Sequence, residues 1–303
     1  MYYYTAYGLN ISSAVFLPEL QVSNHQIADV VITFGKVDLT LPQPEATWDY
    51  FHLEGDSAYL YWKVVGKFLV KSGHEIIIDS LPDVEEQVLR LPLLGAVLSM
   101  LLHQRQYLVL HASAMAIGDS AAVFLGPKGQ GKSTMAATLY GRGNKQMTDD
   151  AAAINIDSDS DTSPILLPGF PQIKLWPEAA TAALGDNPEK LRKIHPEVEK
   201  RARPTVENFL QKSLPLKRVY ILSQGSDIKI KPLQIQEAVT KLIANSYIPM
   251  LLGKKFLQSE TTALHLRQCT HIAKNIPIYS LERPRSLDLL PKVAQLVEED
   301  LAS

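Results

Sequence analysis

The feature that most constrains the fold is a glycine-rich segment, GPKGQGKS, at residues 126–133. It fits the pattern G-x-x-x-x-G-K-[ST] at every fixed position, and a continuous apolar run, AAVFL, stands directly before it at 121–125. Residues 133–140 then have a helical pattern that ends at Gly141 or Gly143. A buried strand, a glycine-rich turn and a helix in this order are the context that a phosphate-binding loop requires.

The residue types of this segment suit the binding of a nucleoside triphosphate. Three glycines let the backbone curl so that successive N–H groups point inward, and the helix that follows presents its positive end to the same anion. Lys132 would reach the β- and γ-phosphates, and the hydroxyl of Ser133 would hold Mg²⁺. The alternative is a glycine-rich turn with a solvated lysine. The residues expected to bind the nucleotide are Gly126, Pro127, Lys128, Gly129, Gln130, Gly131, Lys132, Ser133 and Thr134.

A pair of acidic residues, Asp149 and Asp150, follows a weak strand candidate at 145–147. Adjacent carboxylates at the end of a strand point in divergent directions, so one can hold Mg²⁺ while the other accepts a proton. Crowded carboxylates also raise each other's pKa, which suits a proton acceptor. The alternative is a solvated turn, since Thr-Asp-Asp often caps a helix. His111, at the end of a strand expected at 107–110, is by itself more typical of a core histidine.

The strand and helix pattern divides the chain near residue 105. Residues 1–105 predict a small, β-rich α+β domain, with strands at 2–4, 30–34, 59–65 and 75–78 and a helix at 81–104. Residues 106–303 predict an α/β domain, with strands at 107–110, 112–117, 121–125, 219–222 and 278–281 and helices at 133–140, 235–244 and 287–301. The first domain carries no chemical motif. Its sheet edge offers a place where a peptide could dock.

Composition narrows the function classes. Thirty Lys and Arg residues against 32 Asp and Glu give a net charge of −2, which argues against a dedicated nucleic-acid binder. Cys269 is the sole cysteine, so no intramolecular disulfide and no thiolate zinc cluster can form, and a reducing compartment is the simpler expectation. The longest apolar stretch, 91–102, falls short of the roughly 20 residues that span a bilayer, and residues 1–20 lack a signal-peptide pattern. We therefore expect a cytoplasmic protein without a membrane or nucleic-acid partner.

Three segments together resemble the catalytic domain of HPr kinase/phosphorylase: HAS at 111–113, GPKGQGKST at 126–134 and the acidic pair at 149–150. The match is closer to the HPr-kinase-like serine kinases found beside lasso-peptide biosynthetic genes, which residues 4–20 and 168–180 also resemble. The resemblance implies a P-loop kinase domain of the HPr-kinase C-terminal type that uses ATP and Mg²⁺. It implies that Asp149 acts as base on an acceptor serine, that Asp150 and Ser133 hold the metal, and that His111 is the family's histidine. The partner would be a peptide or small protein that carries the serine.

The sequence departs from that family at two places. The family's metal-binding glutamate falls on Gln172, whose neutral amide is a poorer Mg²⁺ ligand than a carboxylate, and Glu178 is the nearest substitute. The family's signature arginine segment has no clear match, and Arg201 is the candidate catalytic arginine. The reverse phosphorylase activity is therefore not expected, and HPr itself is not the expected acceptor.

Other functions remain open from the sequence. The chain could be a nucleotide-binding switch or scaffold without phosphoryl transfer, which the glutamine at 172 favours. It could also be a kinase for a small metabolite with a hydroxyl group. The choice between ATP and GTP and the oligomeric state, homo-oligomers included, cannot be decided from the sequence.

Overall fold

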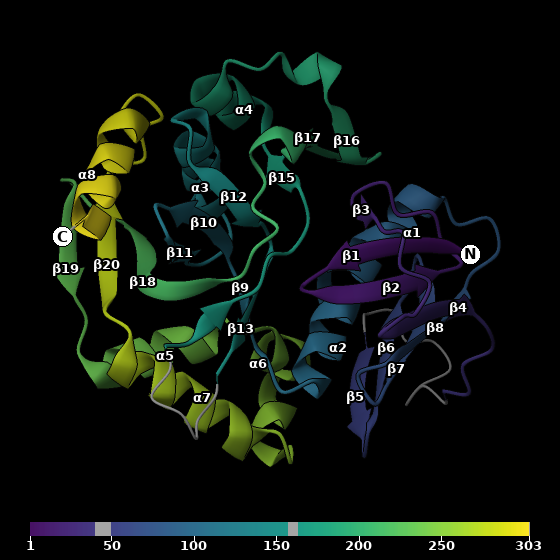
Figure 1. Ribbon diagram of the computed structural model, residues 1–303. Coiled ribbons are helices and arrows are strands. Elements are labelled where there is room, and N and C mark those ends of the chain that lie inside the picture. The colour runs from purple at the N-terminus through teal and green to yellow at the C-terminus, as the bar shows by residue number, and fades with distance from the viewer. Residues whose placement is uncertain (40–49, 157–162, 303) are drawn as a thin grey trace.

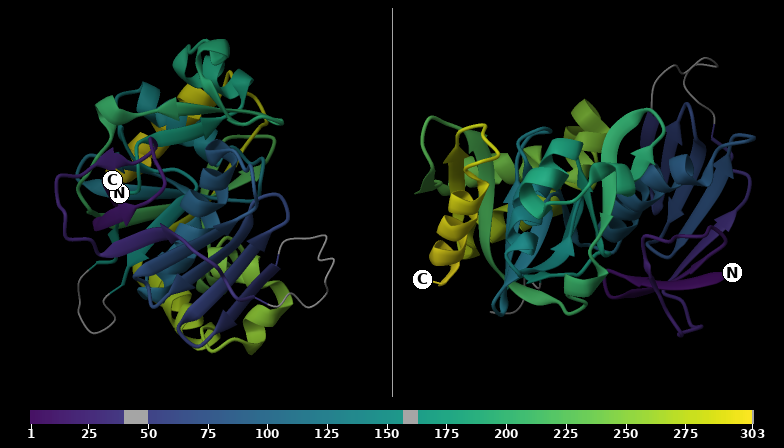
Figure 2. Two further views of the ribbon diagram at one scale, coloured as in Figure 1. Left: turned by 90° about the vertical axis from the view of Figure 1, so that its right-hand side faces the viewer. Right: turned by 90° about the horizontal axis from the view of Figure 1, so that it is seen from above.

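The computed structural model describes residues 1–39, 50–156 and 163–302, and it shows a mixed α/β protein (Figure 1). The strands of these residues form three sheets of eight, nine and three strands. The sheet that contains the N-terminus lies at one end of the molecule and the C-terminal helix lies at the opposite end (Figures 1 and 2).

The N-terminal sheet has the strand order β3-β1-β2-β4-β8-β7-β6-β5. One of its faces is buried: along β7, buried residues alternate with less buried ones, and Phe68 and Val70 are fully buried. The strands predicted at 2–4, 30–34 and 75–78 are confirmed within a few residues, and the one predicted at 59–65 begins earlier and ends earlier. The bounds are β1 Tyr2–Ala6, β2 Leu9–Ser13, β3 Gln21–Val22, β4 Val30–Phe34, β5 Tyr50–Glu54, β6 Ser57–Trp62, β7 Gly66–Lys71 and β8 Glu75–Ser80.

A helical segment joins this sheet to the rest of the chain. It consists of α1 (Glu86–Pro92), a wider π-type segment η1 (Leu93–Val97) and α2 (Leu98–Gln104). It begins five residues later than predicted, because Asp83 has a left-handed φ of 61° that no helix tolerates.

No helix in the described part of the chain is long and apolar enough to cross a bilayer.

Helix α2 packs against β7 on one side and against β9 and β13 of the second sheet on the other. One hydrophobic cluster therefore contains Phe68 from before the predicted domain boundary and Phe170 and Tyr247 from after it. The boundary near residue 105 stays a prediction, and the two parts of the chain share a core across it.

The nine-stranded sheet explains the apolar run before the glycine-rich loop. Strand β11 lies between β10 and the parallel strand β18, and every residue from Ala121 to Leu125 is buried. Val123 and Leu125 face one hydrophobic cluster while Phe124 faces another, so both faces of the strand are covered. The strands are β9 Leu108–His111, β10 Ser113–Ile117, β11 Ser120–Leu125, β12 Lys145–Thr148, β13 Ala151–Asn155, β14 Ile165–Leu166, β18 Leu214–Gln224, β19 Lys229–Pro232 and β20 Ile278–Arg283.

Helices cover both faces of this sheet. Helices α3 (Lys132–Gly141), α4 (Pro177–Leu184) and α8 (Leu290–Ala302) pack on one face, and α5 (Ile235–Ala244) and α7 (Thr262–Asn275) pack on the other. Helix α6 (Tyr247–Leu252) contacts α2. The helices predicted at 133–140, 235–244 and 287–301 are thus confirmed as α3, α5 and α8.

A small third sheet lies beside α3, and it completes the surroundings of the glycine-rich loop. It has the order β15-β17-β16, with β15 Gln172–Leu175, β16 Arg192–His195 and β17 Val198–Pro204. Strand β15 contacts α3 directly. The start of α3, the ends of β11, β18 and β20, and the turn between β12 and β13 are consequently brought to one edge of the main sheet.

Candidate active site

The glycine-rich loop joins β11 to α3 and has the backbone that its glycines allow. Gly126, Gly129 and Gly131 have φ values of 150°, 87° and 84°, which are open to glycine and costly for other residues. Gly131 immediately precedes the first turn of α3, so the loop ends where the helix presents its unpaired N–H groups. This is the backbone arrangement of an anion site at a helix N-terminus.

Lys132 lies folded back over the loop. Its side chain is buried, and Nζ donates to the carbonyl oxygen of Gly126 over 2.8 Å. Burial lowers the pKa of Lys132, and the nearby carboxylates of Asp150 and Asp149 offset only part of this effect. A buried ammonium whose charged form is penalised by burial gains stability from any anion brought next to it.

The acidic pair forms the tight turn between β12 and β13. Asp149 is 3% exposed, its Oδ1 accepts from Ser113 Oγ at 2.5 Å, and its Oδ2 accepts from the backbone N–H of Lys174 at 2.9 Å. Asp150 has a left-handed φ of 85°, a backbone conformation that residues other than glycine rarely adopt. Its Oδ2 lies 2.9 Å from Lys174 Nζ, and its Oδ1 lies 3.2 Å from His111 Nδ1.

The N-terminal part of the chain contributes to this turn. Tyr7, between β1 and β2, is buried, and its hydroxyl donates to the carbonyl oxygen of Ala151, the first residue of β13. Thr148 Oγ1 donates to the same carbonyl oxygen over 2.6 Å. The two aspartates are thus held by side chains from both parts of the molecule.

The charges around Asp150 overturn one expectation from the sequence. Burial alone would raise the pKa of Asp150, but Lys174 and then His111 outweigh it and hold that pKa well below its ordinary value. Burial would likewise lower the pKa of Lys174, but Asp150 outweighs it and raises that pKa. Mutual repulsion of the carboxylates therefore does not raise the pKa of Asp150. A carboxylate held ionised by two partners is a poor proton acceptor, so Asp149 is the better candidate for a base.

A single cleft of about 620 Å³ brings the loop and the acidic pair together. This volume lies within the range of small-molecule and cofactor sites. Of the candidate residues from the sequence, those that line it are His111, Lys128, Gly129, Gly131, Lys132, Ser133, Thr134, Asp149 and Asp150. Gly126, Pro127 and Gln130 shape the loop but do not line the cleft.

The cleft is positively charged although the chain as a whole carries −2. Three acidic side chains line it, those of Asp149, Asp150 and Glu178, against six basic ones. This surplus of three positive charges in a concave site suits a polyanionic ligand. The basic residues are Lys128, Lys132, Lys174, Lys200, Arg283 and Arg285.

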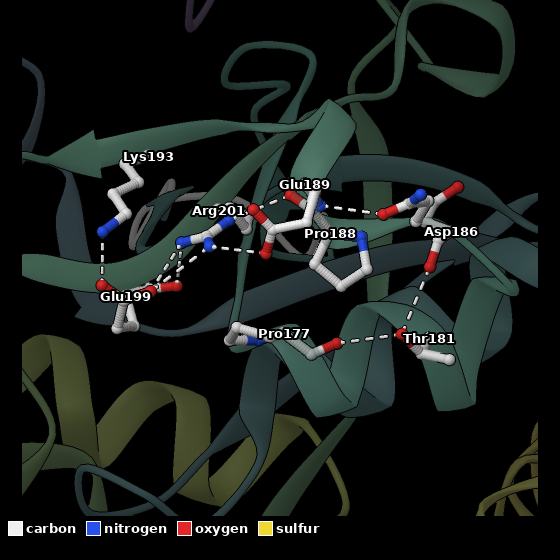
Figure 3. Close-up of polar contacts among 9 residues, drawn as sticks. Pro177, Thr181, Asp186, Pro188, Glu189, Lys193, Glu199 and Arg201 are labelled. Carbon is white, nitrogen blue, oxygen red and sulfur yellow. Dashed lines mark hydrogen bonds and ion pairs between the residues drawn. The ribbon is translucent and has the colours of Figure 1, made fainter.

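Arg201 does not line this cleft, and we remove it from the candidate catalytic residues. Along β17 successive side chains point to opposite faces, and Lys200 faces the cleft, so Arg201 points away from it. Its side chain is 4% exposed, and its guanidinium donates to the carbonyl oxygen of Pro188 at 3.0 Å and pairs with Glu189 and Glu199 (Figure 3). These contacts tie β17 to the loop that precedes β16.

Gln172 is also outside the cleft, whereas Glu178 lines it from the first turn of α4. The side chain of Gln172 lines a small cavity beside Glu19 and Arg90. Among the described residues no group of three or more His, Cys, Asp and Glu is placed to hold a metal ion. Ser133 and Asp150 both line the cleft and carry oxygen ligands, the kind that would hold an Mg²⁺ ion together with the substrate's phosphates.

Sequence reasoning missed four basic residues of the cleft: Lys174, Lys200, Arg283 and Arg285. Arg283 ends β20, which is parallel to β18, and ligands of α/β sheets bind beyond the carboxyl ends of parallel strands, so its position was the available signal. Its Nη2 donates to the carbonyl oxygen of Gln130 at 3.1 Å, and its Nε is buried with no hydrogen-bond partner in the described chain. Burial lowers the pKa of Arg283. No local pattern pointed to Lys174.

Comparisons with known proteins add little. No protein-family model matches the chain. No curated protein matches it either. Among solved structures, the chain is similar to the Hpr(Ser) kinase/phosphatase from Coxiella burnetii, with 10% identity, a TM-score of 0.33, and coverage of 64% of this chain and 99% of that one. Similarity at this level is too low to support a conclusion about fold or activity.

Proposed function

We propose that the protein is an ATP- and Mg²⁺-dependent kinase that transfers the γ-phosphate to a serine hydroxyl of a peptide or small protein. The observation that carries the proposal is the single cleft in which the loop before α3 faces Asp149 and Asp150. A phosphate site and a buried carboxylate on either side of one space are the two parts that phosphoryl transfer to a hydroxyl needs. The resemblance to HPr-kinase-like serine kinases supports a domain of that type in residues 106–303 and a precursor peptide as acceptor.

In this proposal the loop and Lys132 bind the phosphates of ATP. The N–H groups before α3 and the ammonium of Lys132 stabilise negative charge on the transferred group. A bound Mg²⁺ ion would supply charge neutralisation for the transferred phosphoryl group. Ser133 and Asp150 are the residues of this chain that would hold it.

Asp149 is the proposed base. The acceptor oxygen forms a bond to the γ-phosphorus, the bond from that phosphorus to the leaving ADP oxygen breaks, and the hydroxyl proton passes to Asp149. Ser113 and the Lys174 N–H each occupy one carboxylate oxygen, and they fix the direction in which Asp149 points. A carboxylate can accept about four hydrogen bonds, so these two contacts leave it able to accept the proton.

A second function is a nucleotide-binding switch that transfers no phosphate. The observation that favours it is that all four oxygens of Asp149 and Asp150 already have hydrogen-bond or ion-pair partners. A switch needs only the phosphate site and has no use for a free carboxylate. A kinase of a small hydroxyl-bearing metabolite would share the site of the first proposal and differ in its acceptor.

Mass spectrometry distinguishes the kinase from the switch. The full chain is incubated with ATP, Mg²⁺ and synthetic peptides that contain one serine, beside twins in which alanine replaces it. We expect a phosphorylated product from the serine peptides only. Asp149→Asn should abolish the product while calorimetry shows ATP binding largely kept, and Asp119→Asn, in the exposed turn between β10 and β11, is the matched control. Transfer that persists in Asp149→Asn would refute the role of that residue.

A further inference from the structure

Lys174 contacts both members of the acidic pair, although it belongs to a different sheet. Its backbone N–H donates to Asp149 Oδ2 at 2.9 Å, and its Nζ lies 2.9 Å from Asp150 Oδ2. Its side chain is 13% exposed. The ammonium is therefore held against the carboxylates within the cleft and is not a solvated surface charge.

The remaining carboxylate oxygens are also occupied. Asp150 Oδ1 lies 3.2 Å from His111 Nδ1, and Asp149 Oδ1 accepts from Ser113 Oγ at 2.5 Å. A divalent cation that entered here alone would have to displace these partners. It would also approach the ammonium of Lys174, and two positive charges a few ångströms apart in a partly buried site repel each other strongly.

The strand that carries Lys174 supplies no acid to offset this repulsion. Gln172, two residues earlier on β15, is a neutral amide outside the cleft, and the described chain offers no third acidic or histidine side chain that would complete a metal site with the pair. The site therefore holds an ammonium, and not a further acid, against the acidic pair.

We propose that Lys174 is a built-in counter-ion that prevents the acidic pair from binding a divalent cation by itself, so that the cation enters only together with the phosphates of a nucleotide. Lys174 acts through the carboxylates and is a positioning residue. The part of this inference that concerns nucleotide-bound metal rests on the proposed kinase function. The part that concerns the nucleotide-free protein rests on the geometry alone.

The test is a Mn²⁺ titration of the full, nucleotide-free chain, with free Mn²⁺ followed by electron paramagnetic resonance. Wild type should bind Mn²⁺ weakly, and Lys174→Gln should tighten the dissociation constant by about tenfold or more, since a unit charge in contact with the site is removed. Lys200→Gln is the matched control, because it removes the same charge from the same cleft without a hydrogen bond or ion pair to either aspartate. Its effect should be much smaller. Adding Asp150→Asn to Lys174→Gln should abolish the gain.

Three results would overturn the inference: equal Mn²⁺ affinity in wild type and Lys174→Gln, an equal gain in Lys200→Gln, or a gain that survives Asp150→Asn. Should Lys174→Gln fail to fold, wild type alone decides. One tightly bound Mn²⁺ ion per chain, lost in Asp150→Asn, would refute the counter-ion role, and weak binding would support it. Calorimetry of ATP binding to the same samples tests the proposed kinase function independently of the Mn²⁺ titration. Absence of ATP binding would refute the kinase and leave the Mn²⁺ result standing.

Discussion

Two glycines of the phosphate loop offer a matched pair for testing how the loop is built. Gly129 and Gly131 have nearly the same left-handed backbone, with φ of 87° and 84°. A Cβ added at Gly129 would meet nothing within 4 Å. A Cβ added at Gly131 would lie 2.3 Å from Nη2 of Arg283, so the guanidinium would have to move.

The expected costs follow from these contacts. Alanine in the left-handed region costs about 1–2 kcal/mol relative to glycine, so this conformational strain lowers the unfolding free energy of both variants. Gly131→Ala also displaces Arg283 from the carbonyl oxygen of Gln130, and a hydrogen bond to a charged group is worth about 1.5–3 kcal/mol. We therefore expect Gly131→Ala to lower the unfolding free energy by about 1.5–3 kcal/mol more than Gly129→Ala does.

Urea unfolding followed by circular dichroism, without nucleotide, measures this difference. The same two alanine variants are then made in an Arg283→Ala background, where the clash is gone and only the backbone cost remains. The two glycine positions should then become equivalent. Equal costs in the presence of Arg283, or a difference that persists after its removal, would refute the contact between Arg283 and the loop.

Two further predictions concern buried charges. Burial lowers the pKa of both His103 and His265 to about 4, from 6.5 in the unfolded chain, so below pH 6.5 the unfolded chain binds protons that the folded chain does not. As the pH is lowered from 6.5 to 4, the unfolding free energy should fall by about 1.4 kcal/mol per pH unit for each histidine. In His265→Gln, the urea midpoint should fall with pH about half as steeply as in wild type. Equal slopes in the two proteins would contradict this prediction. Arg90 lies 3.1 Å from Glu19, with both side chains under a tenth exposed, so Arg90→Leu should cost about 1.5–3 kcal/mol, the loss of one hydrogen bond to a charged group, because Arg192 still pairs with Glu19. In the double variant Arg90→Leu/Glu19→Leu, thermal unfolding should show that part of the lost stability returns. A double variant as unstable as Arg90→Leu would count against the Arg90–Glu19 pair.

The fold could be predicted from the sequence where a segment has a single clear pattern of apolar residues. The apolar run at 121–125 is buried on both faces of the sheet, and the helix predicted at 235–244 has the bounds of α5. The segment 245–275 was not predicted, and it contains α6 and α7. The buried side of α7 includes His265 and Gln268, and polar residues there hide the apolar period on which a helix prediction depends.

The candidate site likewise contains residues that local sequence patterns predicted and residues that they did not. The loop and the acidic pair each lie within a few residues of a strand end, so their residue types and spacing suggested phosphate and proton chemistry. Arg201 was chosen by residue type alone. Which face of β17 it occupies depends on how that strand pairs and packs, and no local pattern states this.

By itself the sequence determined the strand, loop and helix around residues 121–141, because a glycine-rich backbone and an apolar period act between near neighbours in the chain. Only the tertiary structure decided that Lys174, on another sheet and 24 residues beyond Asp150, contacts both carboxylates, and that Arg283 donates to the loop. These contacts join segments far apart in the chain. Their charges become partners because strand pairing and core packing bring them within hydrogen-bond distance, and that outcome depends on the whole chain.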